Sequence, residues 1–262
     1  MTLFFHEMRQ NRITLIVWSA ILSFIMAVSI VIYPEMSSEL GELGGMFSEM
    51  GEFSEAFGMT ELNFGEFIGY FGVECGNSFG LGGAFFAAIL GISALAKEER
   101  DRTAEFLLTQ PISRTSVVAR KLMAVIAQIA VLNVSVVLVS IGAMAAIGET
   151  ESLDVAALIL LSHFFMQIEI AAVTFGISAF IKRNGMGIGI GIAAIFYFIN
   201  IIANLTEELD ALKYLTPFGY TESAYIINNS ALHLGYLAVG ALFAAIGIVL
   251  AFVKYTKKDI AS

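Results

Sequence analysis

The chain has 262 residues, of which 58% are hydrophobic and 14% are charged, and its formal net charge is −9. Soluble globular domains average about 45–50% apolar and about 25% charged residues. This composition, with a mean hydropathy of +0.82, therefore excludes an ordinary soluble domain, and it also excludes a disordered chain. The single cysteine, Cys75, excludes an intrachain disulfide and a zinc site built from several cysteines.

Six apolar segments are long enough to cross a bilayer as helices. A hydrocarbon core of about 30 Å needs about 20 helical residues, and the strong alternation of a membrane barrel is absent from these segments. The predicted fold is therefore all-α and polytopic, with one transmembrane domain over residues 1–262. The predicted spans are residues 13–33, 78–96, 122–147, 155–181, 185–205 and 232–253, with an outer loop at 34–77 and a re-entrant outer segment at 206–231.

The basic residues are sorted along the chain. With six spans, 13 of the 14 lysines and arginines lie on the side that holds both termini, and only Lys213 lies on the other side. Basic residues mark the cytoplasmic side of membrane proteins. We therefore expect a multi-pass protein of the cell (plasma or inner) membrane with both termini in the cytoplasm. Residues 1–12 are amphipathic, and lie either in the cytoplasmic interface or as a simple anchoring tail.

Two outer segments carry further patterns. In residues 34–77, apolar side chains recur every three or four positions between glutamates, which predicts an amphipathic helix that serves as a gate or as a plain connection. The segment 206–231 is partly apolar and is interrupted by Pro217 and Gly219. It is expected to form one or two short helices that enter the outer leaflet, or alternatively a surface loop.

The connection between the second and third spans reads KEERDRTAEFLLTQPISRTSVVARKL from Lys97. Residues 97–109 can form a helix of about three turns, which Pro111 ends because the residue before a proline is driven out of the α region. Ser113 is placed to cap the third span. The result is a short amphipathic coupling helix on the membrane surface, joined to a span at each end, so that a push on it moves both.

This connection resembles the corresponding region of ABC type-2 permeases, the membrane subunits of ATP-binding-cassette exporters. The matching elements are Glu98-Glu99, Thr103, the stretch from Glu105 to Leu108, the stretch from Pro111 to Arg114, and Lys121-Leu122, with Arg102-Thr103 where the family commonly has Gly-Thr. The resemblance implies a second permease subunit, identical or paralogous, and two copies of a cytoplasmic ABC ATPase.

The same resemblance implies which residues dock the ATPase. They are Glu98, Glu99, Arg100, Arg102, Glu105, Phe106, Leu107, Leu108, Pro111 and Arg114. Alternatively, their charges are merely solvated and anchor the loop. The chain contains no G-x-x-x-x-G-K-[ST] phosphate loop, so ATP and Mg²⁺ would bind the partner, and we expect no cofactor, catalytic residue, metal or nucleic acid for this chain.

Polar residues inside the spans are further candidates. Glu169 lies near the middle of the fourth span, where a charged residue costs about 2.5–3.5 kcal/mol on insertion scales, and it shares a helical face with Ala172, Val173 and Gly176. A second stripe contains His163, Gln167, Thr174 and Ser178. Glu169, His163 and Gln167 are candidates for the translocation route, or else they hydrogen-bond to neighbouring helices. Glycines at 185, 187, 189 and 191, and the ridge Gly72, Gly76, Gly80, Ala84 and Ala88, predict close helix packing.

The expected function is export of a peptide, lipid, drug-like molecule or ion by a permease that a separate ATPase drives. The alternative is an ion-coupled secondary transporter or channel in which Glu169 titrates or coordinates the ion. An intramembrane protease is excluded because the spacing in EERDR does not match an E-E-x-x-x-R motif.

Overall fold

The structure is a computed structural model of residues 1–262 that describes the chain except residues 1, 50, 58–61, 98–111, 182–184 and 258–262. The described part is helical and contains no strand. The α-helices are α1 (Thr2–Gln10), α2 (Arg12–Glu49), α3 (Glu52–Ala56), α4 (Phe67–Glu74), α5 (Leu81–Ala94), α8 (Arg114–Ala146), α9 (Leu153–Ser178), α10 (Met186–Ala203), α11 (Ser223–Asn229) and α12 (Leu234–Lys257). A π-helix, η1 (Cys75–Gly80), joins α4 to α5, and two 3₁₀ helices, η2 (Glu207–Leu215) and η3 (Gly219–Thr221), precede α11.

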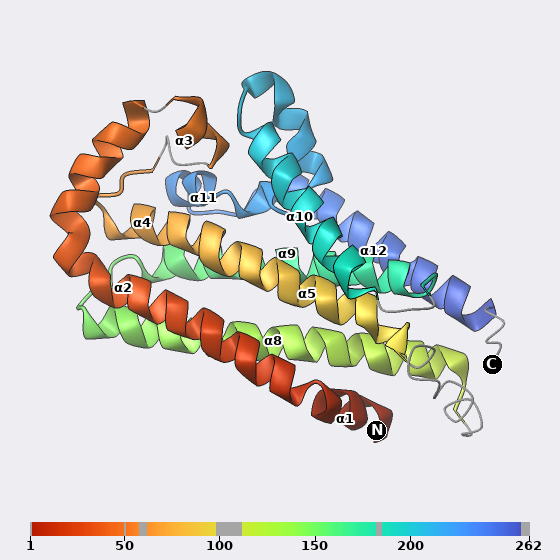
Figure 1. Ribbon diagram of the computed structural model, residues 1–262. Helices are drawn as coiled ribbons and strands as arrows, with labels where there is room; N and C mark the ends of the chain where they lie inside the picture. The colour runs from red at the N-terminus through yellow and green to blue at the C-terminus, as the bar shows by residue number, and fades with distance from the viewer. Residues whose placement is uncertain (1, 50, 58–61, 98–111, 182–184, 258–262) are drawn as a thin grey trace.

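Six helical stretches are long and apolar enough to cross a membrane, as the sequence predicts: Arg12–Ser37, Phe67–Ala94, Arg114–Ala146, Leu153–Ser178, Met186–Ala203 and Leu234–Lys257. They form an elongated bundle (Figure 1). The ends of α5 and α12 and the start of α8 lie at the same end of this bundle as α1. We call this the termini end, and the end that carries α3 and α11 the opposite end.

The second and third spans begin earlier than predicted. The second starts at Phe67 rather than at residue 78, and the third starts at Arg114 rather than at residue 122. Glycines and Glu74 lower the hydropathy of residues 67–77, but the structure satisfies this acid inside the bundle. Its Oε1 accepts hydrogen bonds from Ser29 Oγ at 3.1 Å and Ser78 Oγ at 2.7 Å.

The predicted outer segment 34–77 is helical over much of its described length, as expected for part of it, and its bounds as an outer loop stay a prediction. Helix α2 continues through Pro34 to Glu49, although a proline inside a helix costs about 3 kcal/mol. Tyr33, the residue before it, packs its ring on Phe67 and Tyr70 and donates a hydrogen bond to Gly65 O at 2.8 Å. These contacts hold the helix on the second span. Gly51, with φ +52°, separates α2 from α3.

The centre of the bundle is the pair α5 and α9. In the most apolar stretch of each of their spans, 61% of the residues are buried, compared with 17% in α10 and α12. Helix α9 packs against α5 and against α12. Gly185, directly before α10, and Gly189 of α10 approach Ile92 of α5 closely, whereas Gly187 and Gly191 face open space. The predicted close packing therefore involves one of the two glycine pairs within the subunit.

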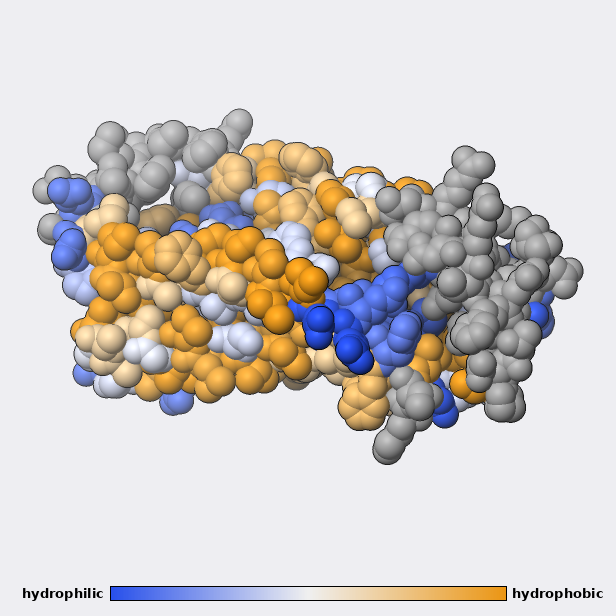
Figure 2. Space-filling model, turned by 60° about the horizontal axis from the view of Figure 1, so that its bottom comes forward, coloured by the Kyte–Doolittle hydropathy of each residue, from blue (hydrophilic) through white to orange (hydrophobic). Residues whose placement is uncertain are grey.

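The outer surface of the spans is apolar. Figure 2 shows hydrophobic residues covering most of the visible face, with a hydrophilic patch right of centre beside the grey residues and further hydrophilic residues at the left end. Large hydrophobic side chains such as Phe24 of α2 and Leu138 of α8 are 68% and 66% exposed. A surface of this kind is suited to lipid rather than to water.

The segment 206–231 forms η2, η3 and α11, so short helices are confirmed. Phe218, Tyr220 and Ile226 are buried against the spans. Ser223 Oγ donates to Gly72 O at 2.9 Å, and Thr216 Oγ1 donates to Phe196 O at 2.8 Å. Protein thus shelters this irregular backbone, as it must wherever such backbone lies at membrane depth. Its depth in the bilayer stays a prediction.

Candidate functional site

The predicted coupling helix itself lies outside the described residues, because residues 98–111 are among those that the structure does not describe. This holds for Glu98, Glu99, Arg100, Arg102, Glu105, Phe106, Leu107, Leu108 and Pro111. The residues on either side of the segment, which we call its supports, are described: Lys97 before it, and Ser113 and Arg114 after it. On the far side, Ser113 has an extended backbone, and its Oγ accepts a hydrogen bond from the Ser116 N–H at 3.2 Å. The predicted cap of the third span is therefore confirmed.

Arg114, the remaining predicted docking residue, is the first residue of α8. Its Nη1 donates to the carbonyl oxygen of Thr256, close to the end of α12, at 3.4 Å. On the near side of the segment, Lys97 Nζ donates to Asn11 Oδ1, at the start of α2, at 3.2 Å. Each support of the connection is thus tied to another helix at the termini end.

A buried ion pair joins these supports to the N-terminal helix, and the sequence analysis missed it. Lys121 of α8 is only 1% exposed, and its Nζ lies 3.0 Å from Glu7 Oε1 of α1. The same ammonium donates to Ala94 O, the last residue of α5, at 2.7 Å. One side chain therefore links α1, α5 and α8. The available signal was the spacing of Leu3 and Glu7, four residues apart, which puts this acid on the apolar face of α1.

Glu169 of α9 is buried, with 5% of its surface exposed. Its Oε2 accepts a hydrogen bond from the hydroxyl of Tyr220 at 2.7 Å, so the segment 206–231 supplies the partner of this acid. Gly240 of α12 lies directly over the carboxylate, and a side chain there would collide with it. The carboxyl group is thereby closed in by α9, α12 and η3.

The rest of the Glu169 face makes the close helix contact that its small residues predict. A Cβ built on Gly176 would lie 2.5 Å from Gly247 O of α12, and a Cβ on Gly247 would lie 2.5 Å from Ala172 O. Here two helix backbones touch, which is the arrangement that small residues permit between membrane helices.

His163 and Gln167 lie one turn apart on a different face of α9, toward α5, and both are fully buried. A Cβ on Gly80 would lie 3.0 Å from His163 Nε2, and Gln167 lies against Gly83 in the same way. His163 Nδ1 lies 2.8 Å from Ile159 O. Because a carbonyl oxygen only accepts hydrogen bonds, Nδ1 carries a proton in this contact, and Nε2 is the ring nitrogen without a hydrogen-bond partner. Gln167 Oε1 accepts from Asn133 Nδ2 of α8 at 2.7 Å.

This second face is incompletely hydrogen-bonded. Among the described residues, the buried polar atoms without a partner include His163 Nε2, Gln167 Nε2 and Asn133 Oδ1. Sequence patterns placed His163 and Gln167 together and Glu169 apart from them, and the structure agrees. Their part in a translocation route stays a prediction.

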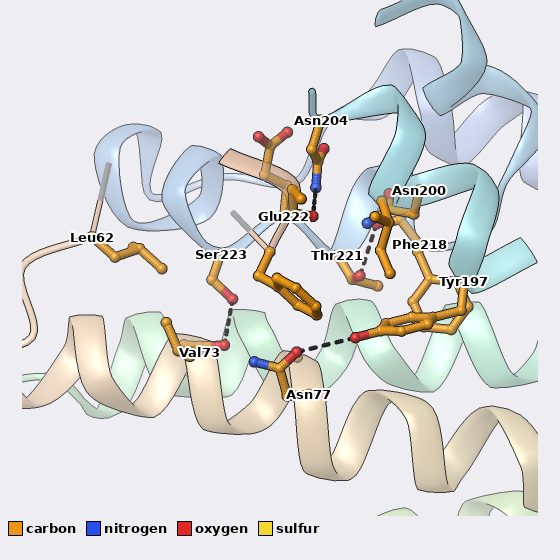
Figure 3. A pocket seen from close by; sticks show the side chains of 15 residues that line it. Leu62, Val73, Asn77, Tyr197, Asn200, Asn204, Phe218, Thr221, Glu222 and Ser223 are labelled. Carbon is orange, nitrogen blue, oxygen red and sulfur yellow. Dashed lines mark hydrogen bonds between the residues drawn. The ribbon is translucent and has the colours of Figure 1, made fainter. Parts of the chain in front are cut away.

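A small pocket lies near the opposite end, between η1, α10 and the segment 206–231 (Figure 3). Its volume is about 70 Å³, and its lining includes Asn77, Tyr197 and Asn200. Tyr197 donates to Asn77 Oδ1 at 3.3 Å. Sites for drug-sized ligands measure about 300–1,000 Å³, so this pocket suits a few water molecules. Within the described part of the chain, no cluster of three or more His, Cys, Asp or Glu side chains could hold a metal ion.

Comparison with known proteins is clear at the level of the family. The model of a family described as "ABC-2 family transporter protein" matches residues 1–260, and a search of the curated proteins gave no match. This family model covers the predicted coupling segment, the six helices long enough to span a membrane and α1. The chain therefore belongs to the ABC-2 family of transporter proteins, as a multi-pass permease component of an ABC transporter.

Proposed function

We propose that this chain is the membrane-spanning permease of an ATP-binding-cassette exporter, driven by a separate ATPase that grips residues 98–111 on the cytoplasmic side. Two ATPase copies would bind ATP and Mg²⁺, and a second permease subunit would complete the transporter. On ATP binding, the ATPases would close and push the segment. The ends of α5 and α8 would then move together and open an outward route.

The observation that carries this proposal is the set of hydrogen bonds that joins the residues flanking the segment to other helices at the termini end. We call this set of contacts the frame. Lys97 is tied to Asn11, and Arg114 to Thr256. Lys121 is held by Glu7 and Ala94 in a buried position. A displacement applied between residues 97 and 113 would therefore reach α1, α2, α5, α8 and α12 together. A solvated loop that only connects two spans would need no such frame.

The decisive experiment is co-purification with candidate ATPases, followed by measurement of ATP hydrolysis. We expect the triple variant Glu98→Ala/Glu99→Ala/Arg102→Ala to lose the ATPase or its stimulation. A matched control is Glu35→Ala/Glu39→Ala, which removes two exposed acids of α2 far from the segment and should leave both unchanged. Unaltered assembly and turnover in the triple variant would contradict docking at this segment.

The proposed orientation supports the same function and has its own test. All described basic residues except Lys213 lie on helices at the termini end or on their flanks, which fits a cytoplasmic location for this end. A membrane-impermeant maleimide should label Glu208→Cys in intact cells and should label Arg9→Cys only after permeabilisation. The reverse pattern would place the segment 98–111 outside the cell and would overturn the proposal. Cys75, the native cysteine, is buried and gives little background.

The direction of transport is tested with inverted membrane vesicles. An exporter takes up its substrate into such vesicles when ATP is added, whereas an importer does not. A lipophilic fluorescent dye is a practical first substrate, and the triple variant described above is the matched negative. The weakly buried helices α10 and α12, with Gly187 and Gly191 facing open space, leave surface for the proposed second permease subunit.

A further inference from the structure

The second span differs from the other five because it contains a π-helix. Helix α4 ends at Glu74, η1 occupies Cys75–Gly80, and α5 begins at Leu81, while the three follow one another without a loop in Figure 1. The described residues of the other spans form α-helix without such a turn. A π bond closes over five residues instead of four, so the turn holds one extra residue, and π turns occur frequently at functional sites.

The part of the span toward the opposite end, α4, is fixed to two neighbours by hydrogen bonds. The Tyr70 hydroxyl donates to Ser29 O of α2 at 3.2 Å, and Ser29 Oγ donates to Glu74 Oε1 at 3.1 Å. Ser223 Oγ of α11 donates to Gly72 O at 2.9 Å. A shift of α4 would break several of these bonds together, so α4 stays with α2 and α11.

The part toward the termini end, α5, is held in another way. Close to η1, Gly83 lies against the side chain of Gln167 of α9. Further along, the backbone at Gly91 lies directly against Ala171 O of α9. The contact between main chains is therefore near the termini end of α5, whereas close to η1 the helix rests on a side chain that can rotate. A force on the termini end would tilt α5 about Gly91.

The π-helix between them has space to change shape. A Cβ on Gly76 would meet no neighbouring atom within 4 Å, and Gly76 and Asn77 line the pocket of about 70 Å³ near the opposite end. Figure 3 shows the Asn77 side chain reaching from this span toward Tyr197, its hydrogen-bond partner. On the side of α9, Gly80 lies against His163, whose Nε2 is buried without a hydrogen-bond partner. The turn thus borders a cavity and a side chain at these two glycines.

We propose that η1 is a hinge at which α5 moves relative to α4. When the termini end of α5 is displaced, α5 tilts about its contact with Ala171, and the extra residue of η1 absorbs the change. Helix α4 then keeps its hydrogen bonds to α2 and α11. The inference rests on the proposed function, because the ATPase that grips residues 98–111 supplies the displacement. It deepens that function by assigning the place in the second span where the displacement is taken up.

The sharpest test removes the extra residue. Deletion of Gly76 lets residues 67–94 form one α-helix while α4 and α5 keep the faces that they turn to their neighbours. We expect the purified variant to fold, with an unfolding temperature within about 5 °C of the unmodified protein. It should still bind the ATPase. Its stimulated ATP hydrolysis should fall by roughly twofold to tenfold, because an unbroken α-helix must break a backbone hydrogen bond to bend.

Two control variants separate the hinge from general effects. Gly76→Ala keeps the extra residue, and its new Cβ meets no neighbouring atom, so ATP hydrolysis should stay as in the unmodified protein. Deletion of Gly191 removes another glycine that faces open space, but from the regular α-helix α10. It turns one part of α10 by about 100° relative to the other and should lower the unfolding temperature far more than deletion of Gly76.

Hydrogen exchange tests the hinge without an ATPase. The unmodified full chain is reconstituted in phosphatidylcholine nanodiscs, and the backbone amides of residues 75–80 are compared with those of residues 160–165 in the part of α9 that contains His163. We expect the π-helix to exchange about tenfold faster or more, because a hinge opens locally. Deletion of Gly76 should remove this difference. If that variant does not fold, the comparison within the unmodified protein decides alone.

Two results would overturn the inference. The first is equal exchange of the two stretches in the unmodified protein, because the π-helix would then be as rigid as α9. The second is full stimulation of ATP hydrolysis in the folded variant that lacks Gly76. Both leave docking at residues 98–111 intact. Unaltered assembly and turnover in the triple variant described above would instead contradict the proposed function, and it would leave the exchange result standing.

Discussion

Helix α9 buries polar groups on two of its faces, and the two faces do so differently. Toward α12, the buried acid Glu169 accepts a hydrogen bond from the hydroxyl of Tyr220, and the backbones of Gly176 and Gly247 touch. Toward α5, His163 and Gln167 lie against glycines, but each retains a ring or amide nitrogen without a partner. The first face is closed by main chain around Gly176 and Gly247, whereas around His163 and Gln167 the second is filled by side chains, and backbone meets backbone there only further along, at Gly91 and Ala171.

This difference implies unequal rigidity. Main-chain atoms cannot move without shifting a whole helix, whereas the end of a glutamine side chain can rotate away. Because His163 Nε2 and Gln167 Nε2 have no hydrogen-bond partner, a movement at the α5-facing side breaks fewer hydrogen bonds. We therefore expect the α9–α12 contact to behave as a fixed joint and the part of the α9–α5 contact around His163 and Gln167 to tolerate change. That would be useful if α5 moves with the coupling segment.

The largest effect is expected from a methyl group at the α9–α12 contact. Gly247→Ala should destabilise the protein by about 3 kcal/mol, the upper part of the usual range for overpacking, because the new Cβ meets Ala172 O and Val173 Cα. Gly83→Ala should cost about 1 kcal/mol, because the first atoms it meets belong to the Gln167 side chain. Denaturant unfolding in detergent measures both.

Gly187→Ala is the matched control for these glycine variants, since no atom lies within 4 Å of its new Cβ. It should be neutral or slightly stabilising, because alanine favours a helix over glycine by about 0.5–1 kcal/mol. If Gly247→Ala were as harmless as Gly187→Ala, the idea of a fixed joint would be wrong.

The next largest effect concerns the hydrogen bond at Glu169. Tyr220→Phe should cost about 1–3 kcal/mol, because it leaves a buried acceptor without its donor. Glu169→Gln keeps an acceptor for the tyrosine and should cost less. Tyr214→Phe, an exposed tyrosine in the same segment, is the control and should be silent in the same unfolding measurement. Equal losses of stability in Tyr220→Phe and Tyr214→Phe would show that the Tyr220–Glu169 hydrogen bond does not stabilise the protein.

A smaller effect is expected on the α5-facing side. Gln167→Leu should cost about 1 kcal/mol, because Asn133 Nδ2 loses its acceptor on α9 but keeps its bond to Ile129 O. Adding Asn133→Leu should recover part of this loss, since replacing both partners by apolar groups is close to neutral. A double-mutant cycle measures the coupling. A coupling as large as that of the Tyr220–Glu169 pair would contradict the contrast between the two faces.

The smallest effect is expected from the ion pairs of Lys213, in the same segment as Tyr220. Lys213 Nζ contacts Asp210 at 3.1 Å and Glu222 at 3.3 Å. Lys213→Met should therefore cost under about 1 kcal/mol. Burial lowers the pKa of Lys213, but the charges of Glu222 and Asp210 raise it more, so its net pKa lies above the ordinary value.

This raised pKa sets the pH dependence of the contribution. The stabilisation is fully present below the pKa of the unfolded lysine, and it is lost as the pH rises through the higher pKa of the folded state. The unmodified protein and Lys213→Met should therefore differ in stability at neutral pH and converge only in strongly alkaline solution. A difference that disappears on acidification to mildly acidic pH would contradict this.

Some of the site was predictable because its signal is local. Spacings of three, four and seven residues put Glu169, Ala172, Val173 and Gly176 on one face and His163 with Gln167 on another, because helical geometry fixes which side chains share a face. The cap at Ser113 was predictable for the same reason. The start of the second span was not, because Glu74 and the glycines look polar or flexible in the sequence. Only contacts with Ser29 and Ser78 make this stretch suitable for the interior.

By itself, the sequence determined the number of spans, their helical character and the sorting of basic residues, since bilayer thickness and charge act on each short stretch independently. Tertiary structure alone decided the partners. Tyr220 reaches Glu169 across 51 positions, and Glu7 reaches Lys121 across 114. No periodicity joins such distant residues. The packing of η3 against α9, and of α1 against α8, brings each pair within hydrogen-bonding distance.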